Sequence, residues 1–214
     1  MFTLLCVMFM ILYSEYIMPW LLDRVMSKPV FARLRQDVLS NVQWNILEIG
    51  IGTGLNVCFY PEDVKKISSV DNNPFLHRLA LKRSIGSGIT IDHYCVSAES
   101  LPFEDASFDS VVCTWTFCSI AYPLSALEEI YRVLKIWWKF IFLEHGLSRD
   151  LKVAWWQNLL TPCWKCVSGG CHLDRDIKKM LSGFSFELTQ YKEFGVAGMT
   201  PLASWMYQGV VVKK

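Results

Sequence analysis

Apolar residues follow two different spacings along the chain, and the two alternate from about position 45 onward. Short β-branched and aromatic runs predict buried strands, while apolar residues three or four positions apart predict helices packed on them. Strands and helices that alternate in this way form a parallel sheet with helices on both faces. We expect strands at 45–49, 66–70, 89–96, 108–115 and 140–143, and helices at 29–42, 54–60, 74–84, 125–134 and 173–181.

Two further apolar runs, 184–194 and 204–212, close the chain without a helical pattern between them. Strands joined without a crossover pair antiparallel, so we expect these two to form a hairpin at one edge of the sheet. The predicted fold class is α/β, with a Rossmann-like, doubly wound and mostly parallel seven-stranded sheet. Residues 147–170 fit neither spacing and are left as an insert before the last helix.

The start of the chain differs from the rest. We expect an apolar segment and lead-in helix over 1–42, and one ligand-binding domain over 43–214. Residues 1–13 carry no charge, but this run is shorter than the roughly 20 apolar residues of a membrane-spanning helix. No basic residues precede it and no cleavage site of small residues follows it, which argues against a signal peptide. Residues 1–22 either make peripheral contact with a membrane or pack on the domain, and both interpretations stay open.

The composition narrows the class of protein. The chain is 52% hydrophobic and 19% charged, which predicts a folded core instead of disorder. The formal net charge is +1 and the basic residues are scattered, so no nucleic-acid partner is expected. Eight cysteines in a chain of this size predict free thiols in a reducing compartment. We therefore expect a cytoplasmic protein, with membrane association left open and no signal for an oligomeric state.

A glycine-rich turn follows the first expected strand. Gly50, Gly52 and Gly54 allow backbone N–H groups to approach a ligand closely, and a helix starting there would add partial positive charge. A dinucleotide fingerprint needs its third glycine one position later, where Leu55 stands. The tighter spacing suits a ligand without a pyrophosphate, and Glu48, just before the glycines, is placed to meet an ammonium group.

Asp71 ends the second expected strand, 21 positions after Gly50. A carboxylate at this point accepts hydrogen bonds from both ribose hydroxyls of a bound nucleoside. A glycine loop alone is weak evidence for a ligand. The loop, the next strand and its terminal acid in one register are together much more specific.

At these residues the chain resembles the class I S-adenosylmethionine-dependent methyltransferases. Segment 48–54 resembles their first motif, 69–74 the ribose-binding turn, 97–103 the segment along the adenine, 107–113 the fourth strand and 127–135 the helix before the fifth. The resemblance implies S-adenosylmethionine as the cofactor and a small molecule as the methyl acceptor. The cofactor-binding residues that it implies are Glu48, Gly50, Gly52, Gly54, Asp71, Asn72, Glu99 and Thr114.

A narrower resemblance points to the alkyl-thiol methyltransferases of animals and their bacterial relatives. It rests on segments 144–146, 156–157, 164–165 and 169–173, and stretch 19–29 resembles the lead-in helix of that subgroup. It implies a small apolar acceptor, with a thiol favoured. The alternatives are a quinone or lipid-amine methyltransferase on the same fold, and a cofactor-binding, membrane-associated protein whose catalysis has decayed.

Methyl transfer to a thiol requires alignment of the acceptor and removal of its proton. His145, after the fifth expected strand, is the first candidate for the base, because ligands bind beyond the carboxyl ends of such strands. His172 is the second candidate. Each has a plainer interpretation, since His145 could cap its strand and His172 could start a helix.

Aromatic residues and cysteines add weaker signals. Trp115 and Phe117 either wall the methionine end of the cofactor or pack in the core, and the tryptophans of the insert either line an acceptor pocket or bury the insert. Those tryptophans are Trp155, Trp156 and Trp164. Cys163-x-x-Cys166 with Cys171-His172 could supply zinc ligands, but the spacing is not that of a known zinc finger, and no metal is expected.

One segment departs from the family. Ile136-Trp137-Trp138 stands where these methyltransferases have Pro-Gly-Gly before the fifth strand. Glycine adopts the positive φ of a tight turn at low cost, and tryptophan does not. Since this turn lies at the end of the strand opposite the expected pocket, we predict lower stability instead of lost binding.

Overall fold

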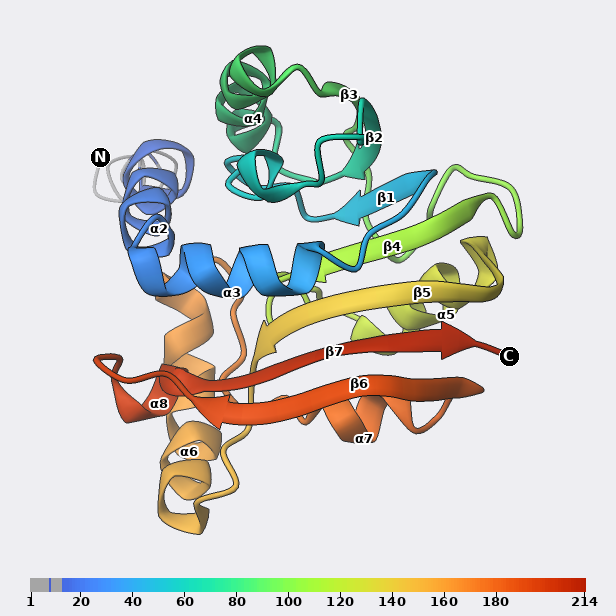
Figure 1. Cartoon of the computed structure of the whole chain (residues 1–214). Coiled ribbons are helices and arrows are strands. Elements are labelled where there is room, and N and C mark those ends of the chain that lie inside the picture. The colour runs from blue at the N-terminus through green and yellow to red at the C-terminus, as the bar shows by residue number, and fades with distance from the viewer. Residues whose placement is uncertain (1–7, 9–12) are drawn as a thin grey trace.

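A seven-stranded sheet forms the centre of the protein in the computed structural model, which describes Met8 and residues 13–214 (Figure 1). The strand order is β3-β2-β1-β4-β5-β7-β6. The first five are parallel, and β7 is antiparallel to both of its neighbours. This confirms the predicted fold class. The strands are β1 (Ile46–Ile49), β2 (Lys66–Val70), β3 (Thr90–Tyr94), β4 (Phe108–Thr114), β5 (Leu134–His145), β6 (Phe186–Gly195) and β7 (Trp205–Lys213).

Helices cover both faces of the sheet, and each face has its own apolar core. One core includes apolar residues of α5 and α7, and the other includes those of α3 and α4. Every residue of β1 and β4 is buried, as expected for strands between two helical layers. The helices are η1 (Tyr13–Ile17), α2 (Met18–Met26), α3 (Pro29–Leu39), η2 (Val57–Phe59), α4 (Pro74–Ser87), α5 (Pro123–Val133), α6 (Leu151–Val167), α7 (Ile177–Leu181) and α8 (Pro201–Ser204).

The prediction of a helix over 54–60, directly after the glycine loop, is wrong. In its place the chain makes the single 3₁₀ turn η2, and Tyr60 after it is extended, with φ −64° and ψ 145°. Pro61 causes this ending, because its ring disfavours the helical conformation at the preceding residue and it has no N–H to donate. Too few residues separate Gly54 from Pro61 for a longer helix.

Other element boundaries also differ from the prediction. Helix α5 begins at Pro123, two residues before the start predicted at Ser125. Helix α7 is confined to 177–181 and is capped by Asp176, whose side chain accepts from the Lys179 N–H at 3.0 Å. The insert left without an assignment contains the 17-residue helix α6.

The Ile136-Trp137-Trp138 segment is a bulge within β5. Phe108 of β4 pairs with Leu134, but Ser110 pairs with Lys139, so residues 135–138 stand opposite Asp109 alone. Trp137 carries the strain, with φ +69° and 68% of its surface exposed. The bulge lies at the amino end of β5, away from the carboxyl ends of the strands.

The lead-in helix predicted over 19–29 is α2, which is tied to the domain by a salt bridge of 2.9 Å between Asp23 and Arg83 of α4. Residues 1–7 and 9–12, on which the membrane-contact interpretation partly rests, lie outside the described residues. Within the described part of the chain, no helix combines the length and apolar character needed to cross a bilayer.

Candidate active site

A cavity of about 500 Å³ opens at the carboxyl ends of β1, β2, β4 and β5. The turns after these strands supply its inner wall, and side chains of α2, α3 and α6 cover it from outside. Its position is the one expected for a ligand in a doubly wound sheet, where the loops at the carboxyl ends of the strands diverge.

The glycine loop needs its glycines for two different reasons. Gly50, Gly52 and Gly54 have φ values of +72°, +54° and +79°, which only glycine adopts at low cost. Gly50 and Gly52 line the cavity, but Gly54 does not. A Cβ atom on Gly54 would lie 2.6 Å from the Cα of Ala80, so this glycine serves the packing of α4 against the loop.

The Asp71 carboxylate joins the two ligand-facing turns. One oxygen accepts from the Gly52 N–H and the other from the Asn73 N–H, each at 2.9 Å. Burial raises the pKa of this carboxyl, and the two backbone hydrogen bonds oppose the shift. Asp71 and Asn72 both line the cavity.

The Glu48 carboxylate lies behind the cavity wall. Its Oε1 accepts from Asn56 Nδ2 and its Oε2 from the Tyr60 hydroxyl, both at 2.8 Å, and Glu48 is not among the lining residues. Burial raises its pKa to about 7, although the two hydrogen bonds and the nearby Arg35 guanidinium oppose the shift. Both carboxylate oxygens of Glu48 are thus held by neighbouring side chains, and the ammonium contact predicted for Glu48 stays a prediction.

Asn56 is the residue that Glu48 positions. Its Nδ2 also donates to Thr114 Oγ1 at 2.9 Å, and its Oδ1 accepts from Arg35 Nε at 3.1 Å. Asn56, Thr114 and Arg35 all line the cavity. Only Thr114 of these three was predicted, because nothing in the spacing of Arg35 or Asn56 relates them to the glycine loop.

Glu99 lines the same cavity and comes from the turn after β3. Its Oε2 accepts from the Ser97 hydroxyl at 3.0 Å, and its Oε1 accepts from the Tyr122 N–H at 2.6 Å, at the start of α5. Both Ser97 and Glu99 line the cavity. The side chain thus holds the 97–99 turn against the amino end of α5.

The opposite end of the cavity is apolar. Trp115 lines it, with the Arg35 guanidinium 4.6 Å from its ring centroid, whereas Phe117 is buried in the core behind it. Trp164 reaches the lining, but Trp155 and Trp156 do not: they are 58% and 50% exposed and pack against each other. Apolar side chains that line the cavity and pack together here include Met26, Phe31, Trp115, Met199 and Met206.

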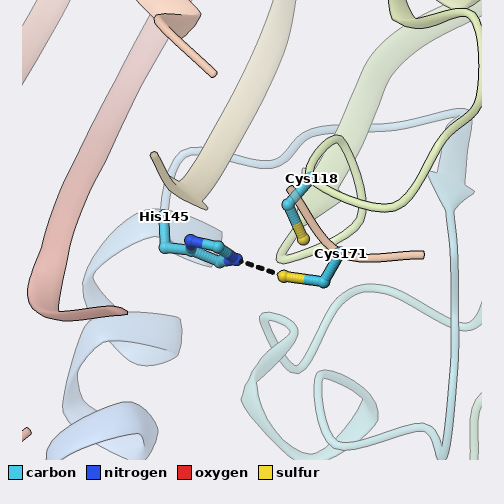
Figure 2. A group of neighbouring side chains, drawn as sticks. All are labelled: Cys118, His145 and Cys171. Atoms are coloured by element: carbon cyan, nitrogen blue, oxygen red, sulfur yellow. Dashed lines mark hydrogen bonds between the residues drawn. The ribbon is translucent and has the colours of Figure 1, made fainter. Parts of the chain in front are cut away.

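Three side chains with sulfur or nitrogen atoms meet at the apolar end (Figure 2). They are Cys118 from the turn after β4, His145 at the end of β5 and Cys171 from the loop after α6, and all three line the cavity. His145 Nε2 lies 2.9 Å from Cys171 Sγ, and the ligand atoms of the three residues lie within 4.8 Å of one another. The Cys118 thiol and burial raise the pKa of the Cys171 thiol above its usual range.

The second predicted base lies elsewhere. His172 is not among the lining residues, and its Nδ1 lies 3.5 Å from Asp174 Oδ1. Cys163 and Cys166 are exposed on α6. The zinc set considered from the sequence is therefore not brought together, and Cys171 instead meets two residues that are distant in the chain.

Comparison with known proteins gives this geometry a context. A family described as "Methyltransferase domain" matches residues 47–140. Thiol S-methyltransferase TMT1B of Rattus norvegicus is 30% identical over 207 residues, which cover 92% of this chain and 82% of the relative. A ubiquinone/menaquinone biosynthesis C-methyltransferase, UbiE of Brucella anthropi, is 32% identical over 183 residues, covering 73% of this chain and 69% of the relative.

The fold also matches solved structures. A structure from Thermotoga maritima, titled as an S-adenosylmethionine-dependent methyltransferase and possible histamine N-methyltransferase, aligns with a TM-score of 0.66. It covers 96% of this chain and 98% of its own length at 20% identity, so it supports the fold alone.

Proposed function

We propose that this chain, which belongs to the S-adenosylmethionine-dependent methyltransferases, methylates the sulfur of a small apolar thiol. Membership of the family gives the cofactor, S-adenosylmethionine, and the reaction, methyl transfer. The identity of the acceptor and the roles of individual residues are our proposal. The observation that carries it is a single cavity with a polar end for the cofactor and an apolar end that holds sulfur and imidazole groups.

The polar end has the groups that the cofactor requires. Asp71 would hold the ribose hydroxyls, and its bond to Gly52 keeps the glycine loop at the distance needed for a close approach of the ligand. The 97–99 turn would border the adenine, with Glu99 fixing that turn on α5. The Asn56 amide, held by Glu48 and Thr114, would face the amino-acid end of the cofactor.

The apolar end favours a thiol over an amine. Both carboxylates in the lining, Asp71 and Glu99, belong to turns at the cofactor end, so no carboxylate at the apolar end would attract a protonated amine. Methionine and aromatic side chains there suit an alkyl chain, since burying apolar surface is favourable at roughly 25 cal/mol per Å². His145 and Cys171 would lie next to the reacting sulfur. The 30% identity to a thiol S-methyltransferase agrees with this choice.

A quinone ring is the second candidate acceptor. The apolar lining and the 32% identity to a quinone C-methyltransferase favour it. A ring carbon differs from a thiol because it needs no sulfur-binding group. Because Cys118, His145 and Cys171 offer such a group, we favour a thiol over a quinone as the acceptor.

The test is a competition among acceptors. Purified protein is incubated with S-adenosylmethionine and one of three probes: an alkyl thiol, a short-chain quinol or an ethanolamine lipid. Methylated product is measured by mass spectrometry. We expect the methyl thioether to form at least tenfold faster than the other products. Faster quinol methylation would overturn the thiol assignment, and cofactor binding without any methylation would support the decayed enzyme.

A further inference from the structure

We propose that Cys118, His145 and Cys171 form a zinc site whose free coordination position faces the apolar end of the cavity. Two thiolates and an imidazole nitrogen are a donor set that zinc prefers. Catalytic zinc sites have three protein ligands and leave the fourth position to water or substrate. The cluster matches this pattern, because three donors converge at a wall of the cavity and each residue also lines it.

The distances between the donor atoms are close to those of a metal site. Zinc lies about 2.3 Å from sulfur and about 2.0 Å from nitrogen in a tetrahedral arrangement, so its ligand atoms are roughly 3.5–3.8 Å apart. The three donor atoms here lie within 4.8 Å of one another, and His145 Nε2 is 2.9 Å from Cys171 Sγ. Side-chain shifts of under about 1 Å would bring them to zinc geometry.

Hydrogen bonds that do not involve the three donor side chains hold the two cysteine-bearing segments in place. The His172 N–H donates to the Cys118 carbonyl at 2.7 Å, which joins the two loops that carry the thiols. The Arg175 guanidinium donates to the Phe117 carbonyl, and to the Ile120 carbonyl at 2.5 Å, so it holds the turn around Cys118. A preorganised set of donors of this kind reduces the ordering that metal binding must impose.

Cys113 shows what a buried cysteine without this role looks like. It lies within β4, fully buried, and its thiol donates to the Glu144 carboxylate at 3.3 Å. It does not line the cavity. Cys118 and Cys171 differ from it because they face the same space as His145 and lie beside each other.

The chemistry rests on the proposed thiol acceptor. A thiol that replaces water on zinc loses its proton to solvent and binds as a thiolate. The thiolate sulfur forms a bond to the methyl carbon of the cofactor. The carbon–sulfonium bond breaks, and its electron pair stays on the neutral thioether S-adenosylhomocysteine. The product is also a neutral thioether, a weaker ligand than a thiolate, so it leaves the metal. His145 is then a zinc ligand instead of the base that the sequence predicts.

The test measures metal content in the full-length, reduced protein. After equilibration with zinc and removal of excess metal, mass spectrometry should find one zinc ion per chain. Cobalt in place of zinc should give the visible bands of a tetrahedral site and a thiolate-to-cobalt charge-transfer band. Cys118→Ser, Cys171→Ser and His145→Ala should lose the bound zinc and these bands.

Cys163→Ser and Cys166→Ser are the matched controls, because both thiols are exposed on α6. They should keep the full zinc content. Circular dichroism and S-adenosylmethionine binding verify that every variant is folded. Wild-type protein that is folded and reduced but holds no more zinc than Cys118→Ser would overturn the site, and so would zinc that is lost from the exposed-cysteine controls. This result is separate from the acceptor assay, since thiol methylation without zinc would leave the proposed function standing.

Discussion

The Asp71 carboxylate accepts a hydrogen bond from the backbone N–H of Gly52 at 2.9 Å, so the acid turn after β2 holds the glycine loop after β1. We predict that Asp71→Ala weakens S-adenosylmethionine binding by about 1–3 kcal/mol, because ribose hydroxyls and the Gly52 N–H lose their acceptor. Calorimetric titration measures this. Asp92→Ala on β3, whose side chain is 41% exposed, is the control and should bind normally. Equal affinity of the two variants would exclude Asp71 from the site.

Two glycines should respond in opposite directions to the same substitution. Gly54 has φ +79°, and a Cβ there would lie 2.6 Å from the Ala80 backbone, whereas nothing lies within 4 Å of a Cβ on Gly86. We predict that Gly54→Ala lowers the free energy of unfolding by more than about 1 kcal/mol. Gly86→Ala, inside α4, should raise it by about 0.5–1 kcal/mol. Urea unfolding measures the free energy of unfolding of both variants. A Gly54→Ala protein as stable as the wild type would show that Gly54 is not needed for the packing of α4.

Glu48 should make the protein less stable as pH rises. Its folded-state pKa is about 7 and its usual value is 4.5, so the folded chain retains a proton that the unfolded chain releases between these values. The free energy of unfolding should therefore fall between about pH 4.5 and pH 7, by about 3 kcal/mol from this group. Glu48→Gln, which has no proton to exchange, should flatten the pH profile in urea unfolding. Parallel profiles for the variant and the wild type would show that Glu48 titrates normally.

The bulge in β5 should be relieved by glycine. Trp137 is largely exposed and has φ +69°, so Trp137→Gly removes backbone strain and loses little buried surface. We predict a gain of about 0.5–1 kcal/mol in the free energy of unfolding. Trp138→Gly is the contrast, because the Trp138 ring lies 5.3 Å from that of Trp44 and packs on the core, and it should destabilise the fold. A lower melting temperature for Trp137→Gly than for Trp138→Gly would show that the backbone at Trp137 is not strained.

Alanine substitutions at His145 and His172 should have different effects on turnover. We predict that His145→Ala lowers kcat for an alkyl thiol by about 100-fold, since a group beside the reacting sulfur is lost, while S-adenosylmethionine affinity changes by less than about twofold. His172→Ala should keep most of its turnover, because His172 does not line the cavity. Steady-state kinetics of both variants test this. Similar losses in the two would indicate a structural effect of the loop that carries Cys171 and His172.

The sequence predicts the parts of this protein that depend on local spacing. The strand over 66–70 matches β2 residue for residue, and the antiparallel edge follows from the missing crossover before β7. Local spacing also predicts the glycine loop and Asp71 as ligand-binding residues, because they belong to one strand–turn–strand unit. Three of these residues, Gly50, Gly52 and Asp71, do line the cavity.

The rest depends on contacts between distant segments, which spacing does not encode. Cys118 and Cys171 are 53 positions apart, and they meet where the loop after α6 is hydrogen-bonded to the turn after β4. Arg35 and Asn56 meet across two elements in the same way. The helix predicted over 54–60 failed for the opposite reason, because the local effect of Pro61 leaves room for only the single turn η2.

That shortened segment has a consequence for ligand selectivity. A long helix pointing its amino end at the glycine loop would attract polyphosphates through aligned peptide dipoles. The single turn η2 provides little of this field, and the Asp71 and Glu99 carboxylates in the cavity lining outnumber the Arg35 guanidinium. We therefore expect ATP and NADH, which share the adenosine group, to be poor competitors, so that charge instead of shape excludes the abundant nucleotides from this pocket.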